Sequence, residues 1–377
     1  IGDSVTEQSI ISWTEAGEER SARWQSENKS AAPKRVVIAD DKLTADSAFR
    51  LASEGNALLW RGDYQNARQL LQALARRTER KPRKAATSPL DAFNLHRQAQ
   101  SQRARTLGML LIEVAADYTV GLRRAPDIKL ACNEAYGASR GSFIVSLREI
   151  LGLIGAHEWR KNGVEIPALN ARIHPYYGVF SPVRGEYLNL IAEAPLPTTK
   201  LAFDIGTGTG VIAALLAQRG VEQVIATDQD PRALACAREN LNRLDLRDRV
   251  EVLEADLFPA GKAALIVCNP PWIPARPNSS IEYAIYDPDS RMLRGFLNGL
   301  AEHLEPKGEG WLILSDLAEH LGLRTRETLQ QMIADAGLKL IKRMDIKPVH
   351  PRAADETDPL HSARSKEITS LWRLAAR

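Results

Sequence analysis

The sequence has few cysteines, no long apolar run and little net charge, and each shortage excludes a class of protein. Its three cysteines, Cys132, Cys236 and Cys268, are too far apart for a disulfide framework or a paired metal site. We therefore expect a reducing, cytoplasmic location and no metal. The sequence contains no stretch of about 18 or more apolar residues that could span a membrane. The first ten residues, IGDSVTEQSI, lack the features of a signal peptide.

The net charge of +3 is too small to indicate a polyanionic partner, so such a partner must be recognised by local charge. Residues 61–105 are locally basic, which makes them a candidate nucleic-acid-binding region. Their basic residues are Arg61, Arg68, Arg76, Arg77, Arg80, Lys81, Arg83, Lys84, Arg97, Arg103 and Arg105, against the acidic residues Asp63, Glu79 and Asp91. A solvated helix face is the alternative explanation for this stretch.

The length of 377 residues predicts at least two domains. Residues 1–40 are polar and are expected to form a flexible N-terminal arm. Residues 41–170 are expected to form a mostly helical, basic substrate-recognition domain, because helical spacing follows a capping Asp63 and recurs further along. The first expected helix follows Asp63 and has the apolar residues Ala67, Leu70, Leu71, Leu74 and Ala75 at helical spacing; the others cover about 90–105, 126–136 and 142–158. The pattern of apolar residues changes at about residue 171, and residues 171–377 are expected to form the second domain.

Short apolar runs alternate with helical patterns in this second half. The runs at 201–206, 223–228, 250–256 and 264–270 read as strands, with helices at 211–220 and 231–244 between them. This alternation predicts an α/β fold with a parallel sheet and helices on both faces. Ligands of such sheets bind at the carboxyl ends of the strands. We therefore expect Asp204, Asp228, Asp256 and Asn269 to line one cleft.

The first strand runs into a glycine-rich turn, DIGTGTGV. Glycines at the start of a helix allow close approach of a ligand to free N–H groups. A dinucleotide site would need glycine or alanine where Val211 stands, and no phosphate-binding lysine follows. The turn therefore favours a ligand without a pyrophosphate. Its candidate binding residues are Asp204, Gly206, Thr207, Gly208 and Gly210.

Two later strand ends suggest the chemistry of that ligand. Asp228 follows the glycines by about 20 residues, where a carboxylate can accept both hydroxyls of a ribose. Asp256 could receive an adenine amino group, with Leu257 or Phe258 packing on the ring. Each aspartate alone could equally be a turn or a helix cap. The glycine turn, Asp228 and Asp256 follow the first, second and third strands in turn. Together they predict an adenosine-bearing cofactor.

The fourth strand ends in Asn269-Pro270-Pro271-Trp272. The prolines end the strand and form a rigid corner without competing N–H groups. This corner can direct the Asn269 side-chain oxygen and the Pro270 carbonyl at the two hydrogens of a planar NH2 group, on which Trp272 can stack. The nitrogen then presents its lone pair to an electrophile without a general base. A buried Asn-Pro turn is the structural alternative.

These motifs resemble class I S-adenosylmethionine-dependent methyltransferases that modify amino or amide nitrogens. DIGTGTG, TDQDPRALACARENLNRL, VEVLEADLF and NPPW are similar to the group of release-factor glutamine-N5, ribosomal RNA guanine-N2 and N6-adenine enzymes, over about 174–346. The resemblance implies S-adenosylmethionine as the cofactor, on Gly206, Gly208 and Asp228, with 269–272 on the acceptor. It also implies a Rossmann-like, seven-stranded sheet with a reversed last strand, completed by strands near 338–346 and 367–374.

The residues leave the acceptor open, because glutamine, adenine and guanine all present a planar NH2 group. We expect a macromolecule of the translation apparatus, either RNA or protein. We place Asn269 at the acceptor and also beside the cofactor. The alternative from another class is a non-catalytic module that binds RNA and retains the cofactor fold as a scaffold.

Overall fold

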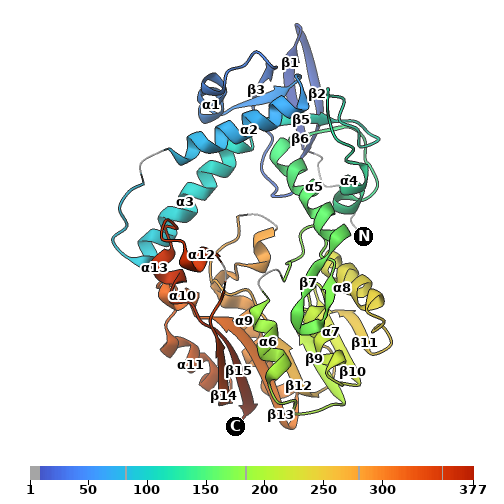
Figure 1. Cartoon of the computed structure of the whole chain (residues 1–377), viewed down its shortest axis with the longest axis vertical. Coiled ribbons are helices and arrows are strands. Elements are labelled where there is room, and N and C mark those ends of the chain that lie inside the picture. Colours follow the sequence, from blue (N-terminus) through green and yellow to red (C-terminus); the bar gives the residue numbers. More distant parts are fainter. Residues whose placement is uncertain (1–8, 81–82, 183–184, 279–280, 350) are drawn as a thin grey trace, which may run out of the picture. The chain divides into compact units, whose positions relative to one another are not determined.

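A computed structural model describes residues 9–80, 83–182, 185–278, 281–349 and 351–377 (Figure 1). The chain forms two compact units. The N-terminal unit contains the residues up to 85 and 95–158. The second unit contains 86–94 and 159–377, and it is called the catalytic unit after the methyltransferase-like motifs that it carries. The units thus divide after residue 158, whereas the sequence suggested a division after residue 170. The reason is local, since Val164, Ile166 and Ile173 pack into the core of the catalytic unit.

The N-terminal unit is built on a six-stranded sheet in the order β1-β2-β6-β5-β4-β3. Its strands are β1 (Ile10–Glu15), β2 (Glu18–Gln25), β3 (Arg35–Ala39), β4 (Asn56–Trp60), β5 (Leu110–Val114) and β6 (Phe143–Ser146). Three of these strands lie within residues 1–40, which corrects the expected flexible arm. They are held by Ile11, Trp13 and Trp24, which are buried against the central strands.

The expected helices of this region are present. They are α2 (Tyr64–Glu79), α3 (Pro89–Leu107), α4 (Lys129–Tyr136) and α5 (Leu147–Asn162), with a further helix α1 (Ala45–Ser53). Asp63 caps α2 as predicted, because its side chain accepts hydrogen bonds from the backbone N–H groups of Gln65 and Asn66. The unit is therefore rich in helix, but the sheet at its centre was not predicted from the sequence.

The catalytic unit contains the predicted seven-stranded sheet, in the order β11-β10-β9-β12-β13-β15-β14. Its strands are β9 (Leu201–Ile205), β10 (Gln223–Asp228), β11 (Val250–Glu254), β12 (Ala263–Cys268), β13 (Leu304–Ser315), β14 (Leu338–Ile346) and β15 (Thr369–Ala376). The first five run parallel, and β15 lies antiparallel between β13 and β14. The reversed last strand is therefore confirmed.

Helices cover both faces of this sheet (Figure 1). On one face, α6 (Glu186–Glu193), α7 (Val211–Gln218) and α8 (Pro231–Arg243) pack against Ala202 and Val267. On the other face, α9 (Arg291–His303) and α11 (Arg326–Asp335) pack against Phe203 and Ile266. Neighbouring residues of one strand thus face opposite cores, as expected for a strand buried on both sides. The remaining elements are β7 (Val164–Ile166), η1 (Pro167–Leu169), β8 (Ala171–Ile173), η2 (Ile281–Ala284), η3 (Pro288–Ser290), α10 (Leu317–His320), α12 (Pro351–Ala354) and α13 (His361–Arg364).

Cys132, Cys236 and Cys268 are free and buried. Burial raises the pKa of the Cys132 and Cys236 thiols to about 12, so both stay protonated near neutral pH. Over the described ranges, no group of three or more His, Cys, Asp or Glu side chains has the arrangement of a metal site. Within the same ranges, no helix is both long and apolar enough to cross a membrane.

Candidate active site

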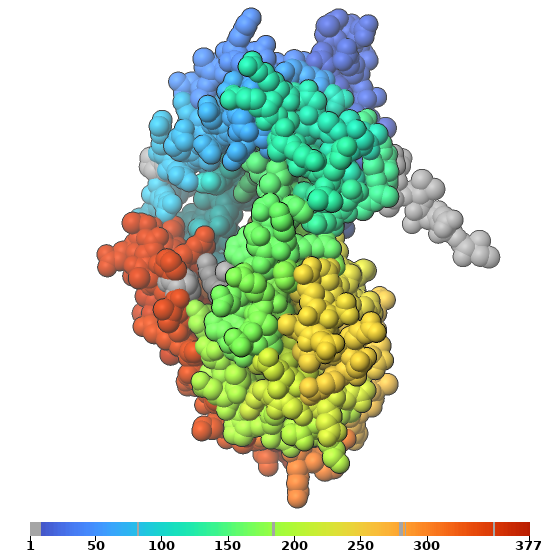
Figure 2. Space-filling model, turned by 45° about the vertical axis from the view of Figure 1, so that its right-hand side comes forward, coloured from blue at the N-terminus to red at the C-terminus, as the bar shows by residue number. Residues whose placement is uncertain are grey.

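The four polar residues predicted to line one cleft follow neighbouring parallel strands. Asp204 lies in β9, Asp228 ends β10, Asp256 follows β11 and Asn269 follows β12. The order β11-β10-β9-β12 makes these strands consecutive neighbours, so their carboxyl ends share one edge of the sheet. This edge is the candidate active site. Figure 2 shows the green-to-yellow part of the catalytic unit, which includes α7 and α8, as one continuous surface.

The three glycines of the turn after β9 all have a positive φ, but their surroundings differ. A side chain at Gly206 would collide with the Met292 methyl group, at 2.5 Å, and one at Gly210 would press on Ala237, at 3.2 Å. At Gly208, by contrast, nothing lies within 4 Å of an added Cβ. Only Gly208 therefore faces open space, where a ligand could approach the backbone closely.

Asp204 is fully buried beneath this turn. Its Oδ2 accepts hydrogen bonds from the Thr207 hydroxyl at 2.7 Å and from the Ala213 N–H at 3.2 Å. Its Oδ1 is buried with no hydrogen-bond partner among the described residues. Burial raises the pKa of the Asp204 carboxyl to about 7, although its two hydrogen bonds act in the opposite direction. Asp204 is therefore a buried polar group at the glycine turn with one unpartnered oxygen atom.

We expect the Asp204→Asn variant to gain stability relative to the wild type as the pH rises from about 4 to 7. In that window the folded wild type keeps a proton on Asp204 that the unfolded chain has lost, so wild-type stability falls with pH. Asparagine does not titrate, and the difference in unfolding free energy should grow by roughly 1.4 kcal/mol per pH unit. Urea unfolding at several pH values measures it. Parallel pH profiles for the two proteins would show that Asp204 does not hold this proton.

Asp228 is partly buried and is held beside the glycine turn. Its Oδ2 accepts the Gly208 N–H and its Oδ1 accepts the Asp230 N–H, both at 3.0 Å. Burial raises the pKa of this carboxyl, against the effect of these hydrogen bonds. Because a carboxylate has about four acceptor positions, both oxygens can still accept hydroxyl groups. The geometry therefore suits a diol placed near Gly208.

The expected contacts at the end of β11 are more mixed. Asp256 is exposed; it accepts a hydrogen bond from the Gln229 side chain and lies 3.8 Å from the Arg291 guanidinium. Leu257 has a φ of 70° and its carbonyl accepts the Thr227 hydroxyl. Phe258 instead stacks on the His303 ring, at 4.2 Å between centroids. Of the two residues considered for packing on adenine, Phe258 is thus engaged within the protein and Leu257 remains the candidate.

The Asn-Pro-Pro-Trp segment forms the predicted corner directly after β12. Pro270 is buried, whereas Asn269, Pro271 and Trp272 are partly exposed. The Trp272 indole N–H donates to Asn269 Oδ1 at 2.8 Å. Since a carbonyl oxygen has two lone pairs, Asn269 Oδ1 can accept one further hydrogen bond. Trp272 also packs partly against the cores of both sheet faces, so its stacking on an acceptor stays a prediction.

Asp287 is a site residue that the sequence reasoning missed. The chain after Trp272 returns to it, because Ile273 pairs with Tyr286 and the Asp287 N–H donates to the Ile273 carbonyl at 2.8 Å. The buried Asp287 carboxylate then accepts the N–H groups of Met292 and Leu293 at the start of α9. Asp287 thus ties the acceptor corner to a core helix. An aspartate four residues before the first residue of α9 (Arg291) was the available signal.

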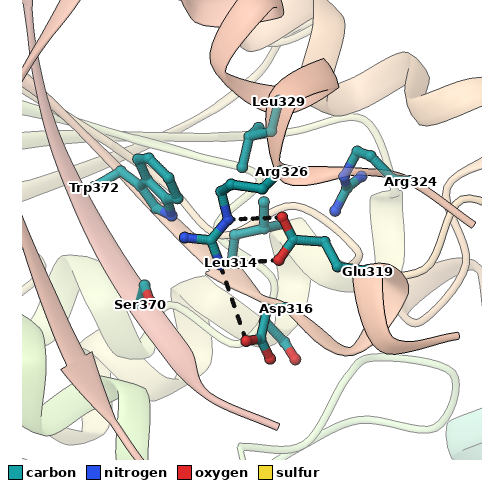
Figure 3. A pocket seen from close by; sticks show the side chains of 9 residues that line it. Leu314, Asp316, Glu319, Arg324, Arg326, Leu329, Ser370 and Trp372 are labelled. Atoms are coloured by element: carbon teal, nitrogen blue, oxygen red, sulfur yellow. Dashed lines mark hydrogen bonds and ion pairs between the residues drawn. The ribbon is translucent and has the colours of Figure 1, made fainter. Parts of the chain in front are cut away.

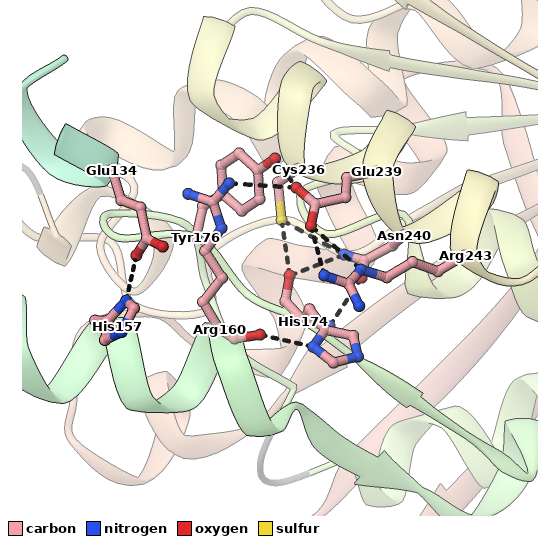
Figure 4. Close-up of polar contacts among 9 residues, drawn as sticks. All are labelled: Glu134, His157, Arg160, His174, Tyr176, Cys236, Glu239, Asn240 and Arg243. Carbon is pink, nitrogen blue, oxygen red and sulfur yellow. Dashed lines mark hydrogen bonds and ion pairs between the residues drawn. The ribbon is translucent and has the colours of Figure 1, made fainter. Parts of the chain in front are cut away.

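Residues 174–176, which precede α6 and β9 in the chain, are held by a polar network on α8 (Figure 4). The Asn240 side chain is buried; it accepts the His174 N–H at 2.8 Å and donates to the carbonyls of His174 and Thr209 at 3.1 and 3.0 Å. Glu239 accepts hydrogen bonds from Tyr176 and Arg160. Because Thr209 belongs to the glycine turn, the Asn240 side chain joins this turn to the segment at His174.

A separate polar pocket lies where β13 ends (Figure 3). Arg326 forms a bidentate pair with Glu319, at 2.7 and 2.9 Å, and approaches Asp316 to 3.9 Å. Its guanidinium also lies 5.2 Å from the centre of the Trp372 ring. These pairs satisfy one another within the pocket, which points to a structural role.

Comparison with known proteins shows which enzymes the catalytic unit is similar to. Residues 172–336 match the family model described as methyltransferase small domain. A tRNA1(Val) (adenine(37)-N6)-methyltransferase of Shewanella loihica is 28% identical over 212 residues, which cover 52% of this chain and 84% of that protein. A release factor glutamine methyltransferase of Cereibacter sphaeroides is 32% identical over 195 residues, covering 48% of this chain and 65% of that protein.

Among solved structures, the match to a methyltransferase from Pyrococcus furiosus covers 61% of this chain and 99% of that chain. The two are 17% identical, with a TM-score of 0.40. The sequence matches confirm the resemblance to class I S-adenosylmethionine-dependent methyltransferases. They favour the enzyme over a non-catalytic scaffold.

Proposed function

We propose that this S-adenosylmethionine-dependent enzyme methylates the exocyclic amino nitrogen of adenine in an RNA. The match of residues 172–336 to the methyltransferase small domain model supports the reaction type. The observation that carries the proposal is the Asn-Pro-Pro-Trp corner at the carboxyl edge of β12, beside a glycine turn with one open position. The relative from Shewanella loihica, named for tRNA adenine, supports RNA as the acceptor. The release factor relative makes a glutamine amide the second candidate.

The residues around the glycine turn fit the cofactor. The proposed contacts are the Gly208 backbone in its open position, the Asp228 carboxylate on the ribose hydroxyls, and Asp256 with Leu257 near the adenine. Asp204 lies buried below the turn, and its Oδ1 has no hydrogen-bond partner among the described residues. When bound, S-adenosylmethionine supplies an electrophilic methyl group. Thr207 contributes indirectly, through the hydrogen bond that its hydroxyl donates to Asp204. Gly206 and Gly210 allow the close packing that shapes the turn.

The acceptor corner positions the nitrogen and does not need to remove a proton beforehand. Asn269 Oδ1 and the Pro270 carbonyl accept the two hydrogens of the acceptor NH2 group, and Pro271 keeps the corner rigid. The nitrogen lone pair is then directed at the methyl donor, so that orientation supplies most of the rate. The proton leaves after transfer, when the methylated nitrogen is strongly acidic.

Identification of the acceptor tests the proposal. Purified enzyme is incubated with radiolabelled S-adenosylmethionine and with RNA or protein from a strain that lacks the gene, and the labelled product is analysed by mass spectrometry. We expect N6-methyladenosine in RNA, and its absence from the RNA of that strain. Label on protein glutamine would replace RNA with the second candidate. Label in neither fraction would overturn the proposed function.

Only some side chains of the basic region, residues 61–105, are proposed to bind RNA. Several of its side chains are engaged within the unit, because Arg77 pairs with Asp46 at 2.8 Å and Arg103 with Glu79 at 2.5 Å. Arg76, Arg80 and Arg83 are exposed, as are Arg68, Lys84 and Arg105, whereas Lys81 lies outside the described residues. The exposed group, rather than the whole stretch, is therefore the proposed phosphate contact.

We expect the triple variant Arg76→Gln, Arg80→Gln, Arg83→Gln to bind RNA less tightly and with a weaker salt dependence. Each lost phosphate contact should reduce the slope of log K against log salt by about 0.7 to 0.9, which gives roughly 2 to 3 for the three. Fluorescence anisotropy with labelled RNA at several salt concentrations measures the slope.

The matched control replaces three exposed lysines, Lys262, Lys307 and Lys339, with glutamine. Lys262 lies just before β12, and Lys307 and Lys339 lie within the first four residues of β13 and β14, near the edge of the sheet opposite the proposed site. The control should leave the slope unchanged. Equal slopes for both triple variants would remove the arginines from the RNA contact.

A further inference from the structure

One face of helix α9 lies against two loops of the proposed cofactor site. Met292 and Gly295 are three residues apart, which makes them neighbours on the helix surface. The Met292 methyl group reaches the glycine turn, where it lies 2.5 Å from the position of an added Cβ at Gly206. Gly295 receives the Leu257 side chain, whose Cδ1 lies 2.6 Å from the position of an added Cβ at Gly295. The helix thus borders both the loop after β9 and the loop after β11.

Gly295 is an unfavourable residue for the interior of α9. Glycine loses more conformational freedom in a helix than alanine does, and the backbone here is helical, so no left-handed conformation requires a glycine. Outside the neighbouring turns of α9, Leu257 Cδ1 and Cγ are the only atoms of the described residues within 4 Å of an added Cβ. Contact with Leu257 is therefore the one feature of these surroundings that favours glycine at this position.

Leu257 itself is held in an unusual backbone conformation. Its φ of 70° lies in the left-handed region, which residues with a side chain rarely adopt, and its carbonyl accepts a hydrogen bond from the Thr227 hydroxyl. Strained backbone of this kind is concentrated at functional sites. The Leu257 side chain is only half-buried and directly follows the exposed Asp256. Because its backbone is fixed, a collision at Gly295 would be relieved by rotation of the Leu257 side chain away from α9.

We propose that Gly295 is a positioning residue for the cofactor. By leaving room for the Leu257 side chain against α9, it keeps open the space in which the adenine of S-adenosylmethionine packs on Leu257. The proposal rests on the proposed function, since that function places Leu257 beside the adenine, but it does not depend on the methyl acceptor. Gly295 acts through Leu257 and does not itself touch the cofactor.

The first test is the Gly295→Ala variant of the full chain. The added methyl group should turn Leu257 into the adenine space, so S-adenosylhomocysteine should bind roughly 5- to 50-fold more weakly in calorimetry, as for overpacking by one carbon. 5′-Methylthioadenosine, which lacks the amino-acid end, should lose affinity by a similar factor. The midpoint of urea unfolding should be no lower than that of the wild type, because alanine favours the helix. Wild-type affinity, or weaker binding accompanied by a lower unfolding midpoint, would overturn the proposal.

A second pair of variants tests whether the effect passes through Leu257. Leu257→Ala should itself weaken the binding of S-adenosylhomocysteine, since the adenine loses an apolar contact. With the leucine side chain removed, the Gly295→Ala change displaces nothing, so Leu257→Ala/Gly295→Ala should bind within twofold of Leu257→Ala alone. A further loss of affinity in the double variant would show that Gly295 acts by another route, which contradicts the proposal.

Gly152→Ala is the matched control. Gly152 lies inside α5, and no atom of the described residues lies within 4 Å of an added Cβ, so this variant gains the same helix propensity without a collision. Its cofactor affinity should equal that of the wild type, and a loss like that of Gly295→Ala would refute the positioning role. None of these measurements needs a methyl acceptor. A wild type that binds S-adenosylhomocysteine but methylates no RNA would therefore refute only the proposed function, whereas failure of the wild type to bind it would refute both.

Discussion

The Asn269→Ala variant is expected to transfer methyl groups roughly 100-fold or more slowly than the wild type, with nearly unchanged affinity for S-adenosylmethionine. The loss is that of a preorganised polar contact in an active site. Cofactor affinity is spared because the proposed cofactor contacts come mainly from the glycine turn and from Asp228. Single-turnover rates with saturating cofactor, together with calorimetry, separate the two quantities.

Asn189→Ala is the matched control, since Asn189 is exposed on α6 and plays no part in the proposed site. It should retain the wild-type rate. An Asn269→Ala protein that is folded, loaded with cofactor and fully active would disprove the proposed acceptor contact. Loss of stability and of cofactor affinity together would instead favour the structural Asn-Pro turn.

The Asp228→Ala variant is expected to bind S-adenosylmethionine about 10- to 150-fold more weakly. A hydrogen bond to a charged group contributes about 1.5 to 3 kcal/mol, and each 1.4 kcal/mol is a factor of ten in affinity. The structure adds a second reason, because the variant also loses the contact that holds the Gly208 N–H. Isothermal titration calorimetry gives the affinity directly.

Glu254→Ala provides the control for this variant. Glu254 pairs with Asp228 in the register of β10 and β11, and it is exposed. Its removal should change affinity by less than twofold. If Asp228→Ala folds normally and binds the cofactor as the wild type does, Asp228 has no place in the site.

The catalytic unit could be predicted closely because its signals are local. Each strand is a short apolar run, each crossover is a helix with its own periodicity, and the motifs stand at strand ends. The capping Asp63 and the helix it begins were predictable for the same reason. In the N-terminal unit the partners are remote, since β2 pairs with β6 more than a hundred residues later. Its β2 is largely exposed, so no alternation of apolar residues reveals it.

The sequence by itself determined the order of the motifs, the parallel sheet and the edge at which the polar strand ends gather. Strand alternation fixes these features, because a right-handed crossover leaves few other arrangements. Only the tertiary structure decided which glycine of the turn faces open space, since Gly206 and Gly210 are pressed against Met292 and Ala237. It also decided that Asn240 holds His174 and that Tyr187 packs against Trp272. Each of these two contacts joins residues more than 60 positions apart, and packing rather than local pattern selects such partners.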